Sequence, residues 1–576
     1  MRGARAVVSI AVVHWTSLLA RRRLASVVLA LIALVTAGTI GASGAPSSRA
    51  SGSILRVGTT YYIDSLNPFV AFDAQAVNAF TMLFPQLVQY GPGLKLQGDW
   101  ASSWSHSADG LVWTFHLRSG GKWSDGVPLT ADDAVWTIST ELKYSSGATS
   151  FLASELTGVK SASAPNATTL VITYSHPVAA TLANLEQFFV LPKHIWAAHV
   201  GTKGSGLKAF FPEKQLPVVS GGPYVISKYA PKGTTVYKPN PSFYGPKSNA
   251  AAVTLTYYTN PTSMIADFEA GNLDFIDNVP YTDANTLKGH SGVTLNDVPG
   301  SEVTNLGFNS NPAKPKNREL LDPKLKEAFE YAIPRKQLVD VVFGGHAQPW
   351  ANIMSAFSVP SGWVNPAVKP LPYDPAKAKA ILDGLGYKAS SGGVRQVPAT
   401  TGTYAQPAHA MSYDVIVPND LDFNGDRQFA ILAAAFANVG VQLHEVAGGD
   451  VGQAYTDVTA PKGTYKSADM YTWYWHPYVD PNFNLSVVTK AQWNNNSDTG
   501  YNDPKYDAWY NQQQTIVNQK KRQALVWKME AYLARQRPYI QLVDTNLLTA
   551  NSTRWTGFYP DLWSYCKCYY TSPHPS

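Results

Sequence analysis

Several short stretches of the chain are predicted to be β-strands from their apolar residues and the turn signals that follow them. Residues 111–118 alternate apolar and polar side chains, and the pair Gly120-Gly121 ends the stretch with a turn. A polar, aromatic loop at residues 61–68 follows the first strand. The other predicted strands lie at residues 54–59, 101–105, 170–174, 224–229 and 253–258.

Apolar residues at helical spacing predict helices between and after these strands. Pro334 ends a helix over residues 325–333, and glycines end the helices over 375–385 and 426–439. Thr130 is expected to cap a further helix whose first turn holds two acids. Others are predicted at 264–270, 506–519 and 522–536. Strands and helices mix without strict alternation, which indicates an α/β protein of several interleaved lobes.

The composition is that of a globular protein with an unusual share of aromatic residues. Hydrophobic residues make up 45% of the 576 residues and charged residues 15%, and the chain holds 16 Trp and 31 Tyr. Such rings can line a large ligand cavity. The net charge is +6, but residues 1–45 contain five arginines and no acid, so the remainder is nearly neutral. Neither nucleic acid nor a membrane surface is therefore an expected partner.

Residues 1–45 are predicted to be a signal peptide or an N-terminal anchor. Three arginines at 21–23 precede an apolar run at 24–41 and small residues at 42–45, which is the order of a secretory signal. A run of about 18 residues is also at the lower limit for a membrane span. No cysteine lies near the cleavage region, so the protein is not expected to be a lipoprotein. We expect an exported protein, periplasmic or at the cell surface.

The two cysteines, Cys566 and Cys568, leave three alternatives open. They could form a local disulfide, remain two thiols, or supply half of a metal site. A zinc site is not expected, because the chain has no second cysteine pair and no cluster of histidines. We therefore expect no metal and no cofactor.

Residues 113–135 carry the most specific motif in the chain. They read WTFHLRSGGKWSDGVPLTADDAV and resemble the W-T-F-x-L-R and D-G-x-P-x-T-A-x-D-V signature of the family-five extracellular solute-binding proteins of ABC importers. Six further segments match the family in its own order, so the resemblance extends over about residues 54–560. They lie at 220–224, 240–245, 268–274, 306–309, 325–333 and 501–507.

The resemblance implies a two-lobed, periplasmic-binding-protein-like (type II) α/β fold with an extra domain inserted in the first lobe. Lobe I would comprise 54–97, 218–310 and 541–576, with the extra domain at 98–217 and lobe II at 311–540. A peptide or oligosaccharide would be enclosed between the lobes and delivered by a monomeric protein to the membrane subunits of an ABC permease. The alternative is a membrane-anchored ligand sensor with the same fold and no transport role.

Residues 470–481 occupy the segment that forms the ligand wall in this family. Alternate residues of a strand face opposite sides, so Trp473 and Trp475 are expected on one face and Tyr474 and His476 on the other. Packing of these rings in the core is the competing interpretation. The ligand-binding residues predicted in this segment are Tyr471, Trp473, Trp475, His476 and Asp480.

The resemblance also bears on the class of ligand. Peptide-binding members place an acid four residues before the proline that corresponds to Pro481, to pair with the free amine of the peptide. This chain has Pro477 there, and His476 beside it is mostly neutral at pH 7. Aromatic rings without that acid suit a sugar or another neutral ligand.

Five more residues are predicted to contact ligand from their place in the family pattern. Tyr61, Tyr62 and Asn67 follow the first strand, and Phe308 and Asn309 lie where the chain is expected to cross between the lobes. An ordinary turn and ordinary strand packing are the alternatives for the two groups.

No catalytic residue is predicted, and the protein is not expected to be an enzyme. The chain contains no G-x-S-x-G nucleophile motif, no H-E-x-x-H zinc motif and no G-x-x-x-x-G-K-[ST] phosphate loop. Asp132 and Asp133 are adjacent, so they do not face each other on a helix, and the helix dipole explains them.

Overall fold

The computed structural model describes residues 53–576, apart from residues 72, 151, 403–404, 420–423, 462 and 477. The predicted signal or anchor at 1–45 and Pro477 therefore lie outside the described residues. Residues 50–576 form one compact unit. In the described part of the chain, no helix is both long and apolar enough to cross a membrane.

An eleven-stranded sheet organises this unit. Its strands follow the order β17-β16-β18-β12-β19-β11-β1-β10-β9-β8, and β13 pairs with β19 beside this path. The strands are β1 (Ile54–Thr59), β8 (Tyr224–Lys228), β9 (Thr234–Pro239), β10 (Ala252–Tyr257), β11 (Phe275–Ile276), β12 (Val293–Phe308), β13 (Ala347–Pro349), β16 (Ser412–Val417), β17 (Gln442–Ala447), β18 (Met470–Trp475) and β19 (Tyr539–Ser552).

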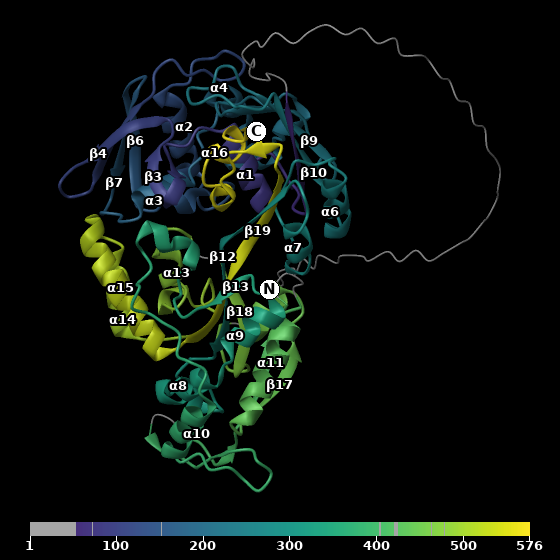
Figure 1. The fold of residues 1–576 in the computed structure, drawn as a ribbon. Coiled ribbons are helices and arrows are strands. Elements are labelled where there is room, and N and C mark those ends of the chain that lie inside the picture. The colour runs from purple at the N-terminus through teal and green to yellow at the C-terminus, as the bar shows by residue number, and fades with distance from the viewer. Residues whose placement is uncertain are drawn as a thin grey trace, which may run out of the picture. The chain divides into compact units, whose positions relative to one another are not determined.

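The long strands β12 and β19 join the two parts of this sheet. We call the part with β1 and β8 to β11 lobe I, and the part with β16 to β18 lobe II. β19 pairs with β11 near its C-terminal end, while the C-terminal half of β12 pairs with β18. The register between β12 and β19 shifts where Pro299 to Glu302 faces Thr545 and Asn546, and we call this place the crossing. Figure 1 shows both strands running from one lobe to the other.

A four-stranded antiparallel sheet forms the region predicted as the extra domain. Its order is β4 (Ala101–His106), β5 (Val112–Leu117), β7 (Thr169–Tyr174) and β6 (Val159–Asn166). Helix α2 (Ala131–Lys143) packs against this sheet. The backbone N–H of Thr130 donates to Oδ2 of Asp133 at 3.0 Å, so the helix begins where the sequence predicts. Buried residues of this sheet and of β1 belong to one continuous apolar core.

The helices and small sheets complete both lobes. In lobe I and the extra domain the other helices are α1 (Ala74–Leu83), α3 (Thr181–Glu186), α4 (Lys193–Trp196), α5 (Ser205–Ala209), α6 (Pro261–Glu269), α7 (Tyr281–Lys288) and α16 (Cys568–Thr571). In lobe II they are α8 (Pro323–Ala332), α9 (Arg335–Gln337), α10 (Pro375–Gly384), α11 (Gly425–Asn438), α12 (Val451–Val458), α13 (Asn482–Ser486), α14 (Pro504–Gln513) and α15 (Gln519–Gln536). Two-stranded sheets pair β2 (Val88–Gly91) with β3 (Lys95–Gly98), β14 (Gln396–Val397) with β15 (His409–Ala410), and β20 (Trp555–Thr556) with β21 (His574–Pro575).

The predicted strands are all confirmed, and the predicted helices are confirmed with shifts at their ends. The largest shift concerns the helix predicted at 506–519, which ends at Gln513. The side chain of Asn518 accepts a hydrogen bond from the N–H of Lys521 at 3.1 Å and caps the next helix, α15. A connection of five residues therefore separates the two helices.

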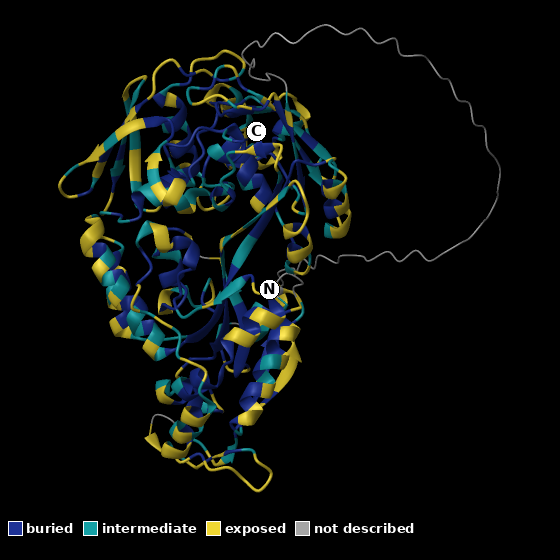
Figure 2. Cartoon of the chain, viewed as in Figure 1, coloured by how far each residue is buried: buried dark blue, intermediate teal, exposed yellow. Residues whose placement is uncertain are grey.

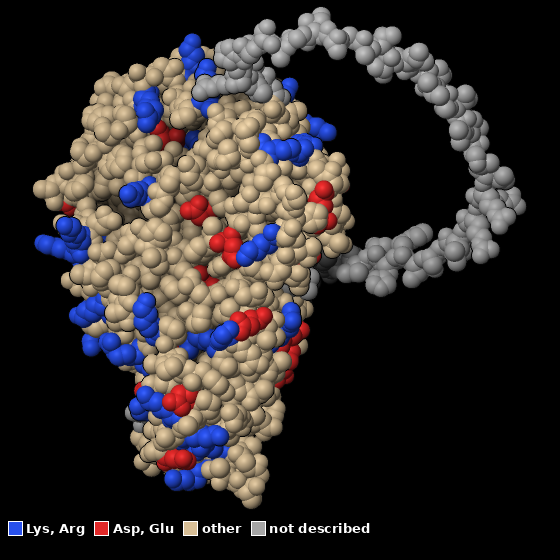
Figure 3. All heavy atoms as spheres, in the orientation of Figure 1, with Lys and Arg blue, Asp and Glu red and all other residues tan. Residues whose placement is uncertain are grey.

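The buried residues lie mainly along the strands of the sheet, and charged residues are sparse on the surface. Figure 2 shows the buried residues along the central strands and the exposed residues on the outer faces of helices such as α15 and α10. Charged side chains of both signs are interspersed with broad uncharged areas on the face seen in Figure 3. This agrees with the nearly neutral charge that the sequence gives residues 46–576.

Candidate ligand-binding site

Lobe I directs the C-terminal ends of its parallel strands toward the crossing. Strand β1 is parallel to β10 and β11, and its Gly58 pairs with Ile276, which pairs with Ala550 of β19. Moving along β1 toward Thr59 therefore moves back along β19 toward Thr545. The loop after β1 leaves lobe I on the side that faces lobe II.

Lobe II has the same arrangement. Strand β18 is parallel to β16, its Met470 pairs with Phe308, and its Trp475 pairs with Val303 beside the crossing. The segment after β18 thus approaches the crossing from the other side. Ligands of open α/β sheets bind outside the carboxyl ends of the strands, so the two converging loops define the candidate site.

Two tyrosines form the lobe I side of this site. Tyr61 is 42% exposed, and its ring lies 6.2 Å from that of Trp563. Asn278 Nδ2 donates to the Tyr61 hydroxyl at 3.3 Å, which fixes the phenol. Tyr62 is partly buried against the edge of Tyr257, with ring centroids 5.9 Å apart. Both predicted residues therefore lie on the loop that faces the crossing.

Aromatic residues at the end of β18 form the lobe II side. Trp475 is partly buried, and its indole Nε1 donates to the Tyr539 hydroxyl at 3.2 Å. Tyr474 lies on the opposite face with the exposed His476, at 5.3 Å between ring centroids. The predicted alternation is confirmed, because Trp473 and Trp475 both pack on the core that contains Tyr471.

The first half of the aromatic segment is core. Tyr471 is fully buried and Trp473 is 4% exposed. A Cβ atom on Gly307 would lie 2.3 Å from the Tyr471 ring, so glycine at that position lets the ring pack directly on β12. These two residues have no surface to offer a ligand in this conformation.

Asp480 is held by the protein itself. Arg522, which is 2% exposed, donates to both of its carboxylate oxygens at 2.6 and 2.7 Å. The Asn482 N–H donates to Oδ1 as well, at 2.9 Å, at the start of α13. These contacts make Asp480 a turn former, since Asp-Pro is a common turn start, rather than a free ligand anchor.

Asn67 is also fully committed to internal contacts. It is completely buried, and its Nδ2 donates to the carbonyl groups of Leu207 at 2.7 Å and Phe210 at 2.6 Å. Its Oδ1 accepts from the N–H of Phe69 at 2.8 Å. Asn67 thus ties the loop after β1 to the extra domain.

The expectation that Phe308 and Asn309 lie at the lobe crossing is wrong. Phe308 pairs with the first residue of β18, five residues along β12 from Val303, which is about 17 Å along a strand. Both residues are fully buried, and Asn309 Nδ2 donates to the carbonyl of Ala468 at 2.9 Å. They pack inside lobe II at the end of the sheet away from the crossing.

A contact between the lobes lies beside the site and has no counterpart in the sequence predictions. The rings of Tyr565 from lobe I and Phe357 from lobe II stack at 5.6 Å, with Tyr90, Val479 and Leu562 packed around them. We call these five residues the interlobe cluster. Only the aromatic spacing near the C-terminus could have hinted at it.

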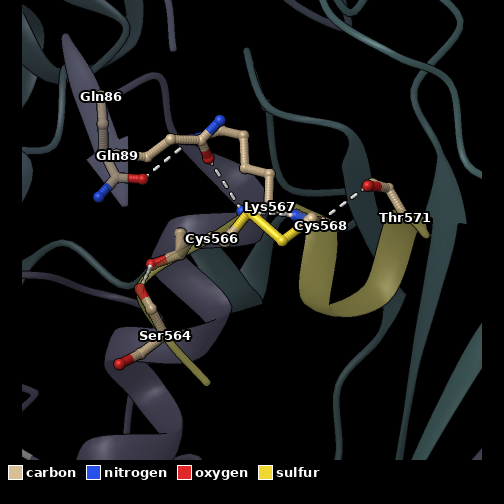
Figure 4. Close-up of a disulfide and its surroundings, with 8 residues drawn as sticks. Gln86, Gln89, Ser564, Cys566, Lys567, Cys568 and Thr571 are labelled. Carbon is tan, nitrogen blue, oxygen red and sulfur yellow. Dashed lines mark hydrogen bonds between the residues drawn. A yellow bond between two sulfur atoms is a disulfide. The ribbon is translucent and has the colours of Figure 1, made fainter. Parts of the chain in front are cut away.

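A disulfide holds the lobe I side of this cluster in place. Cys566 and Cys568 are joined, which decides among the three alternatives that the sequence leaves open (Figure 4). The ammonium of the intervening Lys567 is buried, 2.7 Å from Asp99 Oδ2 and 2.9 Å from Gln86 Oε1. Burial lowers the pKa of this lysine, and the Asp99 carboxylate opposes that shift.

The lobes also touch through the extra domain. The N–H of Ala179 donates to the carbonyl of Gln514 at 2.7 Å, and Val517 packs on the apolar core of lobe I and the extra domain. The connection between α14 and α15 thus reaches across to the extra domain. With the interlobe cluster, this makes the described conformation one in which the lobes are in contact.

A cavity of about 210 Å³ lies within lobe II; it borders Tyr539 but not the loops after β1 and β18. It is lined by the C-terminal part of α15 and the start of β19, including Arg535, Arg537 and Gln541. Arg537 is paired there with Glu330 at 2.7 Å. The site described above rests on the strand ends and not on this cavity.

Comparison with known proteins agrees with this architecture. Residues 95–512 match the model of the bacterial extracellular solute-binding proteins, family 5 Middle. A Brucella ovis protein named as an ABC transporter peptide-binding protein is 30% identical over 383 residues, 65% of this chain and 68% of the relative. The nickel-binding periplasmic protein of Escherichia coli is 28% identical over 54% of this chain and 58% of its own length.

A solved structure shows the same fold. The ABC transporter substrate-binding protein CtaP of Listeria monocytogenes superposes with a TM-score of 0.74 over 91% of this chain and 99% of its own, at 20% sequence identity. At that identity the likeness concerns the fold alone. The predicted two-lobed α/β fold is thereby confirmed.

Proposed function

Because the chain belongs to family 5 of the bacterial extracellular solute-binding proteins, we propose that it captures a small solute between its lobes and delivers it to an ABC import permease. One observation carries the proposal: the loops after β1 and β18 converge on the crossing from opposite lobes. A solute held there would contact both lobes at once.

Closure about the crossing supplies the mechanism. β12 and β19 connect the lobes, and the irregular register at Pro299 to Glu302 is where the pair can bend. A ligand that contacts Tyr61 and Tyr62 on one side and Trp475 and His476 on the other stabilises the closed form. The interlobe cluster stabilises the same form without ligand.

We take the crossing as the boundary between the lobes in this proposal. Lobe I runs to about Pro299 and resumes at about Thr545, instead of changing over at residues 310 and 541. The extra domain keeps its predicted extent of 98–217, since the connection up to Val218 returns to strand β8 of the large sheet. The protein acts as a monomer outside the cytoplasm, with residues 1–45 as its signal or anchor.

The ligand class follows from the side chains at the strand ends. Of the described residues in 470–481, the carboxylate of Asp480 is occupied by Arg522, so it is not free to pair with a peptide amine. Exposed or partly buried rings remain, which stack on apolar sugar faces and donate hydrogen bonds from their polar atoms. An oligosaccharide is therefore the favoured ligand. A peptide, which the name of the Brucella relative describes, is the second choice.

A thermal-shift screen tests the proposal. The protein is heated with dipeptides, oligopeptides, cello- and xylo-oligosaccharides, and nickel complexes. A ligand at a hundredfold excess over its Kd stabilises the folded protein by about 2.7 kcal/mol, which raises Tm. The matched controls are Trp475→Ala, which should lose the shift, and Tyr373→Ala, an exposed tyrosine beside α10, which should keep it.

The outcomes separate the two ligand classes. A shift with oligosaccharides alone supports the favoured class, and a shift with peptides alone overturns it while keeping the transport role. A shift that Trp475→Ala leaves intact places the ligand elsewhere in the protein. If none of the candidate ligands binds, the result contradicts the proposal in its present form.

A further inference from the structure

A buried carboxyl group lies directly behind the aromatic strand. Asp498 is 1% exposed and sits in the loop before α14. The hydroxyl of Tyr539, the first residue of β19, donates to its Oδ1, and the hydroxyl of Tyr471 faces the same carboxyl. Nothing in the family motifs of the sequence marks this residue.

The phenol that contacts Asp498 also holds the candidate ligand-binding tryptophan. The indole Nε1 of Trp475 donates to the Tyr539 hydroxyl oxygen at 3.2 Å. The three side chains form a chain of hydrogen bonds from the interior of lobe II to the site. We call it the carboxyl relay, and its members are Asp498, Tyr539 and Trp475.

We propose that Asp498 is a positioning residue that sets the orientation of the Trp475 indole through Tyr539, and so tunes how the site holds its ligand. The statement that Asp498 tunes ligand binding rests on the proposed function, whereas the statement that it orients Trp475 does not. The hydrogen-bond chain itself is independent of which ligand binds.

The direction of the hydrogen bonds gives the relay its effect. A carboxylate can only accept, so it draws the Tyr539 proton toward Asp498 and leaves the phenol oxygen free to accept from the indole. Bonds to a charged acceptor are stronger than bonds to a neutral one, and successive bonds strengthen each other. When the carboxyl is neutral, the hydrogen bond from Tyr539 to Asp498 is weaker, so the indole of Trp475 is held less firmly.

The relay is poised to change its charge near neutral pH. Burial raises the pKa of Asp498 to about 7. Among the described residues, four phenols face it: Tyr455 on α12, Tyr465 after α12, Tyr471 on β18 and Tyr539 on β19. Burial raises the pKa of each, so all four stay neutral while Asp498 titrates.

His476 also lies in this segment, and histidine is the residue type whose charge ordinarily changes between about pH 5 and 8. It lies on the face of β18 opposite Trp475, in contact with Tyr474. Its replacement therefore separates the two possible sources of a pH effect. His476→Ala should leave the relay intact, whereas Asp498→Asn should remove its titration.

Fluorine NMR of the ligand-free full chain tests the relay. The tryptophans are replaced by 5-fluorotryptophan, and Trp475→Phe assigns the resonance of Trp475. Spectra are recorded from about pH 5.5 to about pH 8.5, which spans the raised pKa. The Trp475 resonance should move with one midpoint near pH 7 in the unaltered protein and in His476→Ala. It should not move in Asp498→Asn or in Tyr539→Phe.

Several outcomes would overturn the proposal. The proposal is wrong if the Trp475 resonance does not move with pH in the unaltered protein. It is also wrong if the resonance moves with the same midpoint in Asp498→Asn. Loss of the midpoint in His476→Ala would assign the effect to the histidine. Asparagine has the shape of a neutral aspartic acid. If it nevertheless prevents folding, Tyr539→Phe makes the same test by cutting the relay at its middle.

Binding measurements test the second half of the proposal. Cellotriose and trialanine are the two probes, measured with the unaltered protein and with Asp498→Asn. At about pH 8 the variant should bind the active probe about threefold to tenfold more weakly, the value of one hydrogen bond. At about pH 5.5 the two proteins should bind alike. If the unaltered protein and Asp498→Asn bind the probe equally at both pH values, Asp498 does not tune ligand binding. Failure of both probes, with the NMR midpoint intact, would count against the ligand classes and not against the relay.

Discussion

The two halves of the aromatic segment 471–476 have similar compositions and different environments. Tyr471 to Trp473 are buried, whereas Tyr474 and Trp475 are partly exposed and His476 is fully exposed. β12 pairs with the whole strand, whereas β16 pairs only with Met470 and Tyr471 at its start. From Thr472 onward only β12 among the described strands pairs with it, and Trp473 is buried by the core that contains Tyr471. The aromatic run is therefore core at its start and becomes exposed toward the crossing, beyond the end of its pairing with β16.

The comparison separates residues that contribute to stability from residues that contribute to ligand binding. Residues of the buried half should affect the free energy of unfolding strongly and ligand binding only through it. Residues of the exposed half should affect binding with little change in stability. Three substitutions test this division, and they are ordered by the size of the effect on stability.

Trp473→Ala should have the largest effect. It removes a side chain that is 4% exposed and leaves a cavity between β18 and the core that contains Tyr471. Replacement of a buried tryptophan by alanine costs about 3–5 kcal/mol. Urea unfolding followed by circular dichroism measures it, with Tyr373→Ala as the exposed control. A loss below about 1 kcal/mol would show that the ring is not core and would break the comparison.

Arg522→Met should have the next largest effect. It leaves the Asp480 carboxylate without its two hydrogen bonds from the guanidinium. The Asp480 side chain is only 12% exposed, so water replaces few of the lost contacts. Loss of one partner of a buried ion pair costs about 3 kcal/mol at the low end of its range.

The double variant Arg522→Met, Asp480→Asn is the control for that pair. It should recover part of the loss, because the stranded charge is gone. Urea midpoints of the three variants give the coupling between the two residues. If Asp480→Asn alone abolished ligand binding at unchanged stability, Asp480 would instead belong with the exposed half of the wall.

His476→Ala should have the smallest effect on stability and a clear effect on binding. The side chain is exposed, and replacement of exposed residues changes stability by about 0.5 kcal/mol or less. The thermal shift given by the active ligand should shrink, since His476 lies at the end of the wall. An unchanged shift in His476→Ala, with a reduced one in Trp475→Ala, would confine the wall to the Trp475 face of the strand.

The sequence predicted the local structure well because its signals are local. Alternation, proline and glycine stops and the acids after Thr130 placed strands and helices to within a few residues, except at the C-terminal end of the helix predicted at 506–519. The family motifs predicted the fold, and the family model confirms the membership. Tyr61, Tyr62, Trp475 and His476 lie at the strand ends that face the crossing, as their places in the family pattern suggested.

The remaining site residues could not be assigned from local pattern. Asp480 is paired with a residue 42 positions away, and Asn67 is hydrogen bonded to carbonyl groups more than 130 positions away. Phe308 was misplaced because its position relative to the crossing depends on strand register, which the sequence does not display. The carboxyl relay joins a loop, a crossing strand and the aromatic strand, so it exists only in the folded protein.

The position of β19 in the sheet has a consequence for how the protein can be made. It begins at Tyr539 of 576 residues and lies between β12 and β11, at the centre of the sheet that both lobes share. A ribosome therefore makes all the other strands of this sheet before the central strand exists. Until then β12 and β11 each lack a neighbour on one side, and they stand as open edges that invite wrong pairing. Until β19 is added, both lobes lack the strand that closes the sheet they share, and the unfinished chain is exposed to such pairing.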